Sequence, residues 1–375
     1  MKILISTPTF KPMVGGMEVL ADNFAVHLTQ RGHRVVLVTP IAAKEQDDDV
    51  YKIIRRPSWR EFFSLVKDAD LVLSNGASLY AAPWSMLARK PVVMRHCGYQ
   101  TSAIDGSGWY DGQRAPLRPI ASILFHIRNG RLRNTMRGTL KILALRLFAM
   151  YFVSRNIAIS DWMKQNHPLP NQQRIYEPFP INKFVGARNS TGNYEYDFFF
   201  LGRLITEKGV DVLLEAFGLL QKRSNDKYRL CIIGQGPERK RLELIVKRTG
   251  QQNNVHFSGV LTGNPLVEMI RTCRIAILPS SWEEPFGGVS TELLAAEKSI
   301  ITSRDGAFAE IVGNAGLTFP NGDVDALFRV MELLVNDQEM QVKQRKSCTD
   351  RLNNFNEENI IDEYVELFRE ICEKY

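Results

Sequence analysis

The chain has few cysteines, and no two of them form a C-x-x-C pair. Five cysteines lie far apart along 375 residues, a pattern that predicts reduced thiols in the cytoplasm rather than a disulfide framework. Long apolar runs are also missing. The longest apolar tract, 140–153, is interrupted by Lys141 and Arg146, whereas a membrane-spanning helix needs about 20 mostly apolar residues. We therefore expect no bilayer-crossing helix. The short apolar start, 2–6, suits a buried strand better than a signal peptide.

The remaining composition is that of a folded protein with an excess of positive charge. Hydrophobic residues make up 44% and charged residues 24% of the chain, and the net charge is +7. A basic surface favours an anionic partner, which is a nucleotide, an acidic lipid or a nucleic acid. Because no nucleic-acid-binding motif is present, we expect no nucleic-acid partner.

Short apolar runs alternate twice with amphipathic segments, which favours parallel sheets covered by helices on both faces. The expected strands are 2–6, 34–39, 70–74, 91–95 and 156–160, then 197–201, 229–233, 255–258, 275–278 and 299–302. The expected helices include 17–31, 210–222, 238–249 and 357–374. The predicted fold class is α/β, with two Rossmann-like domains facing each other across a cleft. We expect an N-terminal domain at 1–185, a C-terminal domain at 186–355, and a last helix, 356–375, that packs back on the first domain.

The loop after the strand 197–201 carries two cations ahead of a helix. Arg203 and Lys208 lie five residues apart between Gly202 and Gly209. Backbone amides at such a strand-to-helix turn attract anions, and the two side chains add a planar fork and a point charge. The pattern fits neutralisation of a diphosphate. The alternative is that Arg203 pairs with a core carboxylate and that Lys208 is solvated.

The loop after the strand 275–278 places two carboxylates on either side of a glycine pair. Glu284 precedes Gly287 and Gly288, and Glu292 follows them in what we expect to be the first turn of a helix. Glycines let a ligand approach the backbone, and carboxylates accept hydrogen bonds from hydroxyl groups. The loop suits the sugar and ribose ends of a sugar nucleotide. The alternative is that Glu292 only favours the helix N-terminus and that Glu284 is solvated.

These loops, taken in order, resemble the large retaining group of GT-B glycosyltransferases (glycosyl transferases group 1) that includes glycogen synthase-like and sucrose synthase-like enzymes. The first half of the chain matches this group more loosely. The matching motifs are Gly202-Arg203 with Lys208-Gly209, Gly234-x-Gly236-Pro237, Phe257-x-Gly259-Val260, and Glu284-Pro285-Phe286-Gly287 with Glu292.

The resemblance implies a role for each matching position. Arg203 and Lys208 would bind the diphosphate, Glu284 the donor sugar and Glu292 the ribose. His96 would face the transferred sugar from the first domain. The other implied donor-binding positions are Gly16, Gly234, Val260, Phe286, Gly287, Gly288 and Val289. The implied activity is that of a metal-independent, retaining hexosyltransferase that uses a nucleotide diphosphate sugar, a UDP-sugar on family frequency, and no cofactor.

The implied mechanism is transfer on one face of the sugar, because no carboxylate here is an evident double-displacement nucleophile. Arg203 and Lys208 would stabilise the charge on the departing phosphate, and a phosphate oxygen would take the acceptor proton. The acidic run Asp47-Asp48-Asp49 lies in a polar loop of the first half, and we interpret it as solvated charge. We therefore expect no metal site.

The stretch 112–160 contains no acidic residue and interleaves basic with apolar side chains. Its basic residues are Arg114, Arg118, Arg128, Arg131, Arg133, Arg137, Lys141, Arg146 and Arg155. This profile fits a segment, 114–155, that lies on the anionic inner face of a cell membrane. Such a segment could receive the acceptor, a glycan or a polyprenol-linked sugar. Together with the resemblance, it suggests a role in envelope polysaccharide synthesis. The alternative is a set of ordinary helices with core leucines and solvated arginines.

Three other functions compete with glycosyl transfer. A GT-B-type sugar-nucleotide epimerase or phosphorylase would share the donor loops. A nicotinamide dehydrogenase would need a G-x-G-x-x-G loop after the first strand, and that loop is missing. A basic module without catalysis would bind membrane or nucleic acid but would not turn over a sugar nucleotide.

Overall fold

The computed structural model describes residues 1–13, 15–43, 50–130, 132–189, 192–224 and 227–375. They form two compact units, Met1–Phe179 with Phe355–Tyr375 (unit 1) and Pro180–Asn354 (unit 2). The acidic run Asp47-Asp48-Asp49 and Arg131 of the basic stretch lie outside the described residues.

Unit 1 is built on a sheet of seven parallel strands in the order β3-β2-β1-β4-β5-β8-β9. The strands are β1 (Lys2–Ser6), β2 (Arg34–Thr39), β3 (Lys52–Arg55), β4 (Leu71–Asn75), β5 (Val92–His96), β8 (Arg155–Ala158) and β9 (Gln172–Arg174). Every residue of β4 and β5 is buried, as expected of central strands that are covered on both faces. The strand order reverses between β1 and β4.

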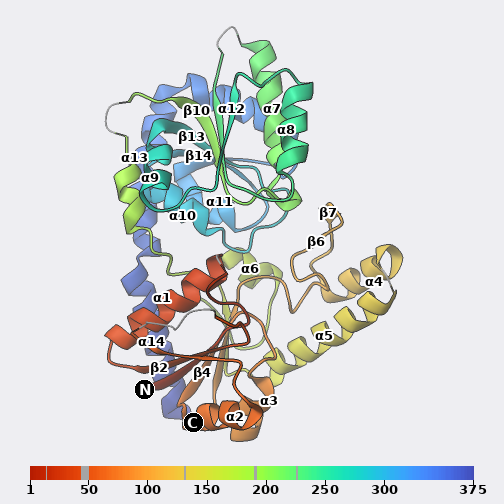
Figure 1. The fold of residues 1–375 in the computed structure, drawn as a ribbon, viewed down its shortest axis with the longest axis vertical. Helices are drawn as coiled ribbons and strands as arrows, with labels where there is room; N and C mark the ends of the chain where they lie inside the picture. Colours follow the sequence, from red (N-terminus) through yellow and green to blue (C-terminus); the bar gives the residue numbers. More distant parts are fainter. Residues whose placement is uncertain (14, 44–49, 131, 190–191, 225–226) are drawn as a thin grey trace. The chain divides into compact units, whose positions relative to one another are not determined.

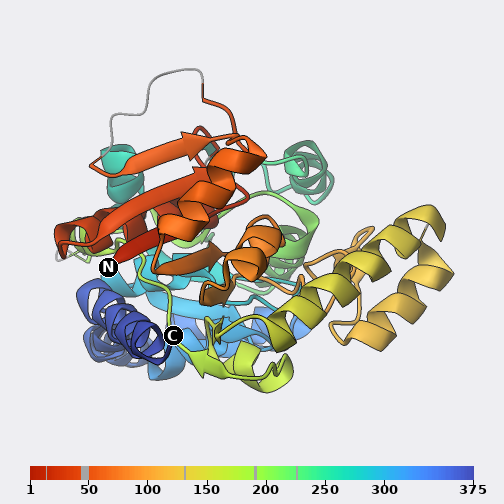
Figure 2. The same cartoon turned by 90° about the horizontal axis from the view of Figure 1, so that it is seen from below.

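The helices of unit 1 cover this sheet, apart from a helical pair that extends from it. They are α1 (Gly16–Gln30), α2 (Trp59–Asp68), α3 (Ala82–Ala88), α4 (Pro119–Asn129), α5 (Leu132–Tyr151), α6 (Asp161–Asn166) and α14 (Glu357–Lys374). A small hairpin, β6 (Trp109–Tyr110) with β7 (Gln113–Arg114), precedes α4. Figures 1 and 2 show α4 and α5 side by side, extending away from the strands of their unit. The C-terminal helix α14 packs on α1, with the Tyr364 ring edge-on to Phe24 at 4.8 Å.

Unit 2 is built on a six-stranded parallel sheet in the order β12-β11-β10-β13-β14-β15. The strands are β10 (Tyr196–Leu201), β11 (Leu230–Ile233), β12 (Val255–Gly259), β13 (Cys273–Leu278), β14 (Ser299–Ser303) and β15 (Gly316–Phe319). This is the strand order of a doubly wound dinucleotide-binding fold, and the order reverses between β10 and β13. Ligands of such sheets bind beyond the carboxyl ends of the strands at the reversal.

Helices cover both faces of the unit 2 sheet. They are α7 (Val210–Arg223), α8 (Arg239–Arg248), α9 (Gly263–Thr272), α10 (Gly288–Ala295), α11 (Ala307–Val312), α12 (Val324–Asn336) and α13 (Gln338–Leu352). Short 3-10 helices also occur in this part of the chain: η1 (Asn182–Ala187), η2 (Thr206–Lys208), η3 (Gly313–Ala315) and, directly after α13, η4 (Asn353–Phe355). Figure 1 shows α7 and α8 on one side of the strands and α9 and α13 on the other. The core between α7, α8, α12 and the sheet includes Phe198, Phe217, Leu242 and Met331, all fully or almost fully buried.

The α/β class and the two Rossmann-like sheets are therefore confirmed. The strands β3, β9 and β15 were not expected from the sequence. Each lies at or next to the edge of its sheet, is only three or four residues long and is only partly buried, so it gives no continuous apolar run.

Candidate functional site

The two loops that carry the predicted cations and carboxylates start from adjacent strands, β10 and β13, where the strand order reverses. The backbone N–H of Ser281 donates to the carbonyl of Glu207 at 2.8 Å, which joins the loops directly. Gly209 has a φ of +61°, and a Cβ there would lie 2.1 Å from the carbonyl oxygen of Pro279. Only glycine fits this contact, so the close approach of the loops is built into the sequence.

An ion pair between Lys208 and Glu284 bridges these loops. The Glu284 side chain is almost fully buried, and its Oε1 also accepts hydrogen bonds from Ser280 Oγ at 2.8 Å and from Trp282 Nε1 at 2.9 Å. The Lys208 ammonium lies 5.8 Å from the centre of the Trp282 ring. A buried carboxylate with three donors is a fixed acceptor, and the partly exposed lysine is the member of the pair that can reach a ligand.

The structure therefore brings together Lys208 and Glu284, two residues predicted from the sequence, and adds Ser280 and Trp282, which the sequence analysis missed. Both lie within four residues of Glu284 on the same loop. Their contact with its carboxylate depends on how the loop folds back, and residue spacing carries no signal for that.

Arg203 is the exposed cation of this group. Its side chain makes no ion pair or hydrogen bond with the residues that the structure describes, so the alternative of a core carboxylate partner is not found among them. The loop beside it is fixed by backbone packing: a Cβ on Gly234 would lie 1.8 Å from the carbonyl oxygen of Gly202, and the Gly234 N–H donates to the Gly259 carbonyl at 2.9 Å. Val260, which follows Gly259, is exposed. Gly234 is thus a packing residue that sets the positions of its neighbours.

The glycine pair opens helix α10. Gly287 has a φ of +83°, and a Cβ there would lie 2.1 Å from the Phe308 ring. Gly288 is the first helical residue and Val289 the second, while Phe286 is buried beneath the turn. Amides in the first turn of a helix have no acceptor within the helix and carry the positive end of its dipole. This end of α10 therefore presents amide donors suited to an anion.

Glu292 is the fifth residue of α10 and lies in its second turn, so the expected position in the first turn is wrong. The helix begins at Gly288, because the left-handed Gly287 acts as its N-cap. Burial raises the pKa of Glu292 to about 7, although the charge of Lys183 acts in the opposite direction. A carboxyl group that titrates near neutral pH is short of hydrogen-bond donors, which ribose hydroxyls would supply.

The other predicted catalytic residue, His96, is the last residue of β5 in unit 1 and is buried. Its Nε2 lies 2.9 Å from Asn156 Oδ1, and the Asn156 amide nitrogen donates to the carbonyls of Ala149 and Pro170. The oxygen of Asn156 thus faces the ring, so Nε2 carries the proton and Nδ1 has no partner among the described residues. Burial lowers the pKa of His96 to about 4, so the ring is neutral at physiological pH.

Two further residues near the β1 and β5 ends can be placed. Gly16 is the first residue of α1, where a Cβ would lie 3.6 Å from Phe179, an ordinary contact. Packing does not require glycine there, which leaves room for a ligand role. Cys97 is a free thiol whose pKa burial raises to about 12, so it is no nucleophile.

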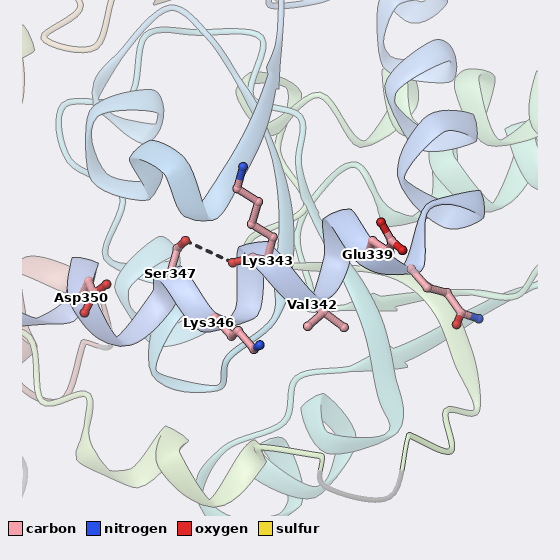
Figure 3. Close-up of a pocket in the computed structure, with 7 residues that line it drawn as sticks. Glu339, Val342, Lys343, Lys346, Ser347 and Asp350 are labelled. Carbon is pink, nitrogen blue, oxygen red and sulfur yellow. Dashed lines mark hydrogen bonds between the residues drawn. The ribbon is translucent and has the colours of Figure 1, made fainter.

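Within the described ranges, no group of three or more His, Cys, Asp or Glu side chains could hold a metal ion. A surface hollow follows the outer face of α13 (Figure 3) and is lined by Gln338, Glu339, Val342, Lys343, Lys346, Ser347 and Asp350. All of these residues belong to one helix, and none is a predicted site residue. This hollow is a groove between neighbouring side chains of a helix and is not the candidate site.

Comparison with known sequences gives a family match and several relatives. Residues 187–351 match the family described as "Glycosyl transferases group 1". An uncharacterized glycosyltransferase of Methanocaldococcus jannaschii, MJ1607, is 28% identical over 341 residues, which cover 83% of each chain.

Solved structures resemble the chain over nearly its whole length. Anabaena Alr3699/HepE in complex with UDP and glucose has a TM-score of 0.75 at 18% identity, covering 98% of this chain and 99% of that one. WaaG, a glycosyltransferase involved in lipopolysaccharide biosynthesis, has a TM-score of 0.67 at 16% identity, covering 97% and 99%. At these identities the likeness establishes the fold.

Proposed function

We propose that this chain, which has the GT-B fold and matches group 1 glycosyltransferases over residues 187–351, transfers a hexose from a UDP-sugar to a glycan or lipid-linked acceptor with retention of the anomeric configuration. The observation that carries the proposal is the Lys208–Glu284 pair where the unit 2 strand order reverses. At this position the Lys208 ammonium, which can reach a ligand, lies beside the Glu284 carboxylate, a fixed acceptor for hydroxyl groups. The UDP and glucose bound in the similar Anabaena protein support a uridine donor.

In this proposal each donor group meets one part of the unit 2 site. Arg203 and Lys208 bind the diphosphate, together with the amides of Gly288 and Val289. Glu284, held by Ser280 and Trp282, accepts hydrogen bonds from the sugar hydroxyls. Glu292 accepts hydrogen bonds from the ribose, and the backbone at Val260 contacts the base.

The chemistry then depends on charge stabilisation. Bond cleavage leaves negative charge on the diphosphate, and Arg203 and Lys208 stabilise it from fixed positions. The acceptor attacks the same face from which the diphosphate leaves, and a phosphate oxygen takes its proton. His96, which is neutral, accepts a hydrogen bond from a hydroxyl group of the transferred sugar at its free Nδ1 and cannot act as a cationic acid at physiological pH. The reaction as proposed needs neither a metal nor a cofactor.

The helical pair α4–α5 supports a membrane-bound acceptor. One face of α5 packs into its unit through Ile142, Leu145 and Phe148, as the alternative of core leucines expected. A second, exposed apolar stripe recurs every three or four residues and consists of Leu132, Met136, Leu140, Leu143, Leu147 and Tyr151. No helix in the described part of the chain is long and apolar enough to span a membrane. A helix with an exposed apolar stripe and flanking arginines fits the interface of an anionic bilayer.

We therefore propose peripheral contact of α5 with the inner face of the cell membrane, in synthesis of envelope polysaccharide. Each leucine moved from water into lipid contributes about 1.5–3 kcal/mol, so Leu140→Ser with Leu147→Ser should strongly reduce flotation with phosphatidylglycerol vesicles. Leu244→Ser, at an exposed leucine of α8, is the matched control. Equal flotation of both variants, or no preference for phosphatidylglycerol over phosphatidylcholine, contradicts the membrane contact.

The transfer itself is tested by incubating the enzyme with a panel of UDP- and GDP-sugars, with lipid-linked and free glycan acceptors. We expect release of UDP, a product with the donor's anomeric configuration by NMR, and unchanged activity in excess chelator. Free epimerised nucleotide sugar, or activity that requires inorganic phosphate, would favour the epimerase or phosphorylase alternative. Activity that chelator abolishes and Mg²⁺ or Mn²⁺ restores would contradict the metal-independent mechanism.

A further inference from the structure

A groove in unit 1 runs between the start of α4, the middle of α5 and the segment after α6. None of its lining residues belongs to the donor site described above. Its lining residues are Ser102, Leu117, Arg118, Pro119, Ile120, Ala121, Leu124, Arg146, Gln165, Asn166, His167 and Pro168.

The polar side of the groove carries positive charge that the fold does not use. The side chains of Arg118 and Arg146 make no ion pair or hydrogen bond with the residues that the structure describes, and no acidic residue lines the groove. His167 is only 8% exposed, and its Nε2 has no hydrogen-bond partner in the described part of the chain. The Nε2 atom of His167 is therefore available to a group bound in the groove.

Another part of the groove lining is apolar and open to solvent. Ile120 is 76% exposed and Leu124 is 51% exposed, and with Ile127 they form an exposed stripe along α4. Exposed apolar side chains of this kind gain free energy by contact with lipid. A groove whose lining combines two arginines with exposed apolar side chains matches an anionic head attached to a hydrocarbon chain.

The groove also lies near the residue that the proposed function places at the transferred sugar. The His167 ring contacts that of Tyr99, three residues beyond β5, with the ring centres 4.6 Å apart. Burial lowers the pKa of His167 to about 4, and the nearby charge of Arg146 lowers it further, so this ring is neutral at physiological pH. A ligand held by Arg118 and Arg146 would thus have its head close to the catalytic end of unit 1.

We propose that this groove binds the diphosphate of a prenyl-linked acceptor, with Arg118, Arg146 and His167 on the phosphates and Ile120 and Leu124 on the first prenyl units. The inference rests on the proposed function, because it names the acceptor of that reaction. The neutral His167 donates one hydrogen bond, and the two guanidinium groups offer forks that match phosphate oxygens.

Farnesyl diphosphate is a suitable binding probe, because it joins a diphosphate to a short prenyl chain. The full-length protein without a donor is titrated with this probe, with inorganic pyrophosphate and with farnesol. We expect Arg118→Gln and Arg146→Gln each to weaken farnesyl diphosphate binding about 10-fold, as befits one charged hydrogen bond. Arg137→Gln, at an exposed arginine of α5 outside the groove, is the control and should bind like the wild type.

Three results overturn the proposal. Equal losses in the control variant indicate diffuse attraction by the basic surface. Pyrophosphate that binds as tightly as farnesyl diphosphate indicates a free-phosphate site, and farnesol that does so indicates an apolar surface only.

Two further measurements separate this inference from the donor site. Lys208→Met should keep farnesyl diphosphate binding, and a loss there would place the probe in the donor site and overturn the groove. UDP binding should be unchanged in Arg118→Gln and Arg146→Gln. Failure of the wild type to bind UDP contradicts the proposed function, whereas failure of the wild type to bind farnesyl diphosphate contradicts the groove.

Discussion

At the scale of single residues, the ion pair of Lys208 and Glu284 contributes to the stability of the fold and, in the proposed complex, to donor binding. In the unliganded protein the lysine neutralises a buried carboxylate. In the proposed complex it shares its charge with the donor diphosphate, while Ser280 and Trp282 keep the carboxylate in place. The pair therefore holds both groups in position before the donor arrives.

Lys208→Met should lower the stability of the protein, because it leaves Glu284 buried without its cation. The expected loss is about 1–3 kcal/mol in the free energy of unfolding, measured by denaturant titration. The double variant Lys208→Met/Glu284→Gln should recover most of this loss, because no charge is left unpaired, but it should not recover transfer activity. A double variant as unstable as the single one would show that the pair is not what stabilises these loops.

Glu292 should make stability depend on pH. Its pKa of about 7 in the folded protein lies above the usual value of a glutamate, so folding favours the protonated form. The stabilisation is complete at low pH and is lost as the pH rises from about 4.5 to above 7. Glu292→Gln should thus melt at about the same temperature as the wild type below about pH 4, and at a higher temperature near pH 8. Identical melting curves of the two proteins near pH 8 would contradict the raised pKa.

The same carboxylate should control binding of the ribose. Uridine is the probe here, because it carries no phosphate that titrates in this range. Its affinity for the wild type should rise as the pH passes through 7, and its affinity for Glu292→Gln should be weaker and independent of pH. A pH dependence that survives in the variant would assign the effect to another group.

At the scale of elements, the sequence predicts the central strands and the loops that follow them, because buried parallel strands are continuous apolar runs. The edge strands could not be predicted: β9 reads Gln-Gln-Arg, and only its pairing with β8 makes it a strand. The sequence showed that apolar residues are interleaved in the basic stretch, but it did not show which of them face the core and which face solvent. Ile142 faces the core and Leu143 faces solvent, and only the packing of α5 decides which is which.

The loop contact at Gly209 can be tested with a matched glycine. Gly209 and Gly250 both have a positive φ, but a Cβ would meet the Pro279 carbonyl at Gly209 and nothing within 4 Å at Gly250. Gly250→Ala should cost about 1 kcal/mol of stability from backbone strain and leave UDP affinity unchanged. Gly209→Ala should cost more and should also weaken UDP binding, because it pushes the two donor loops apart. Equal UDP affinities of the two variants would contradict a role of this contact in the site.

At the scale of the whole molecule, the predicted residues fall into two groups. Arg203, Lys208, Glu284 and Glu292 belong to unit 2, whereas His96 and Gly16 belong to unit 1. The donor loops could be predicted from the sequence, because ligands of such sheets bind beyond the carboxyl ends of the strands and these loops carry cations and carboxylates there. The supporting side chains of Ser280, Trp282 and Asn156 were not, because each acts through a contact between segments that folding brings together.

The central claim is that the cations of the first donor loop bind a diphosphate, and calorimetric titration with UDP and uridine tests it most directly. The wild type should bind UDP far more tightly than uridine. Lys208→Met and Arg203→Gln should each weaken UDP binding about 10- to 100-fold, the loss of a charged hydrogen bond, and leave uridine binding nearly unchanged. Lys222→Met, at an exposed lysine of α7, should behave like the wild type. UDP that binds the Lys208 and Arg203 variants as tightly as the wild type would contradict the account.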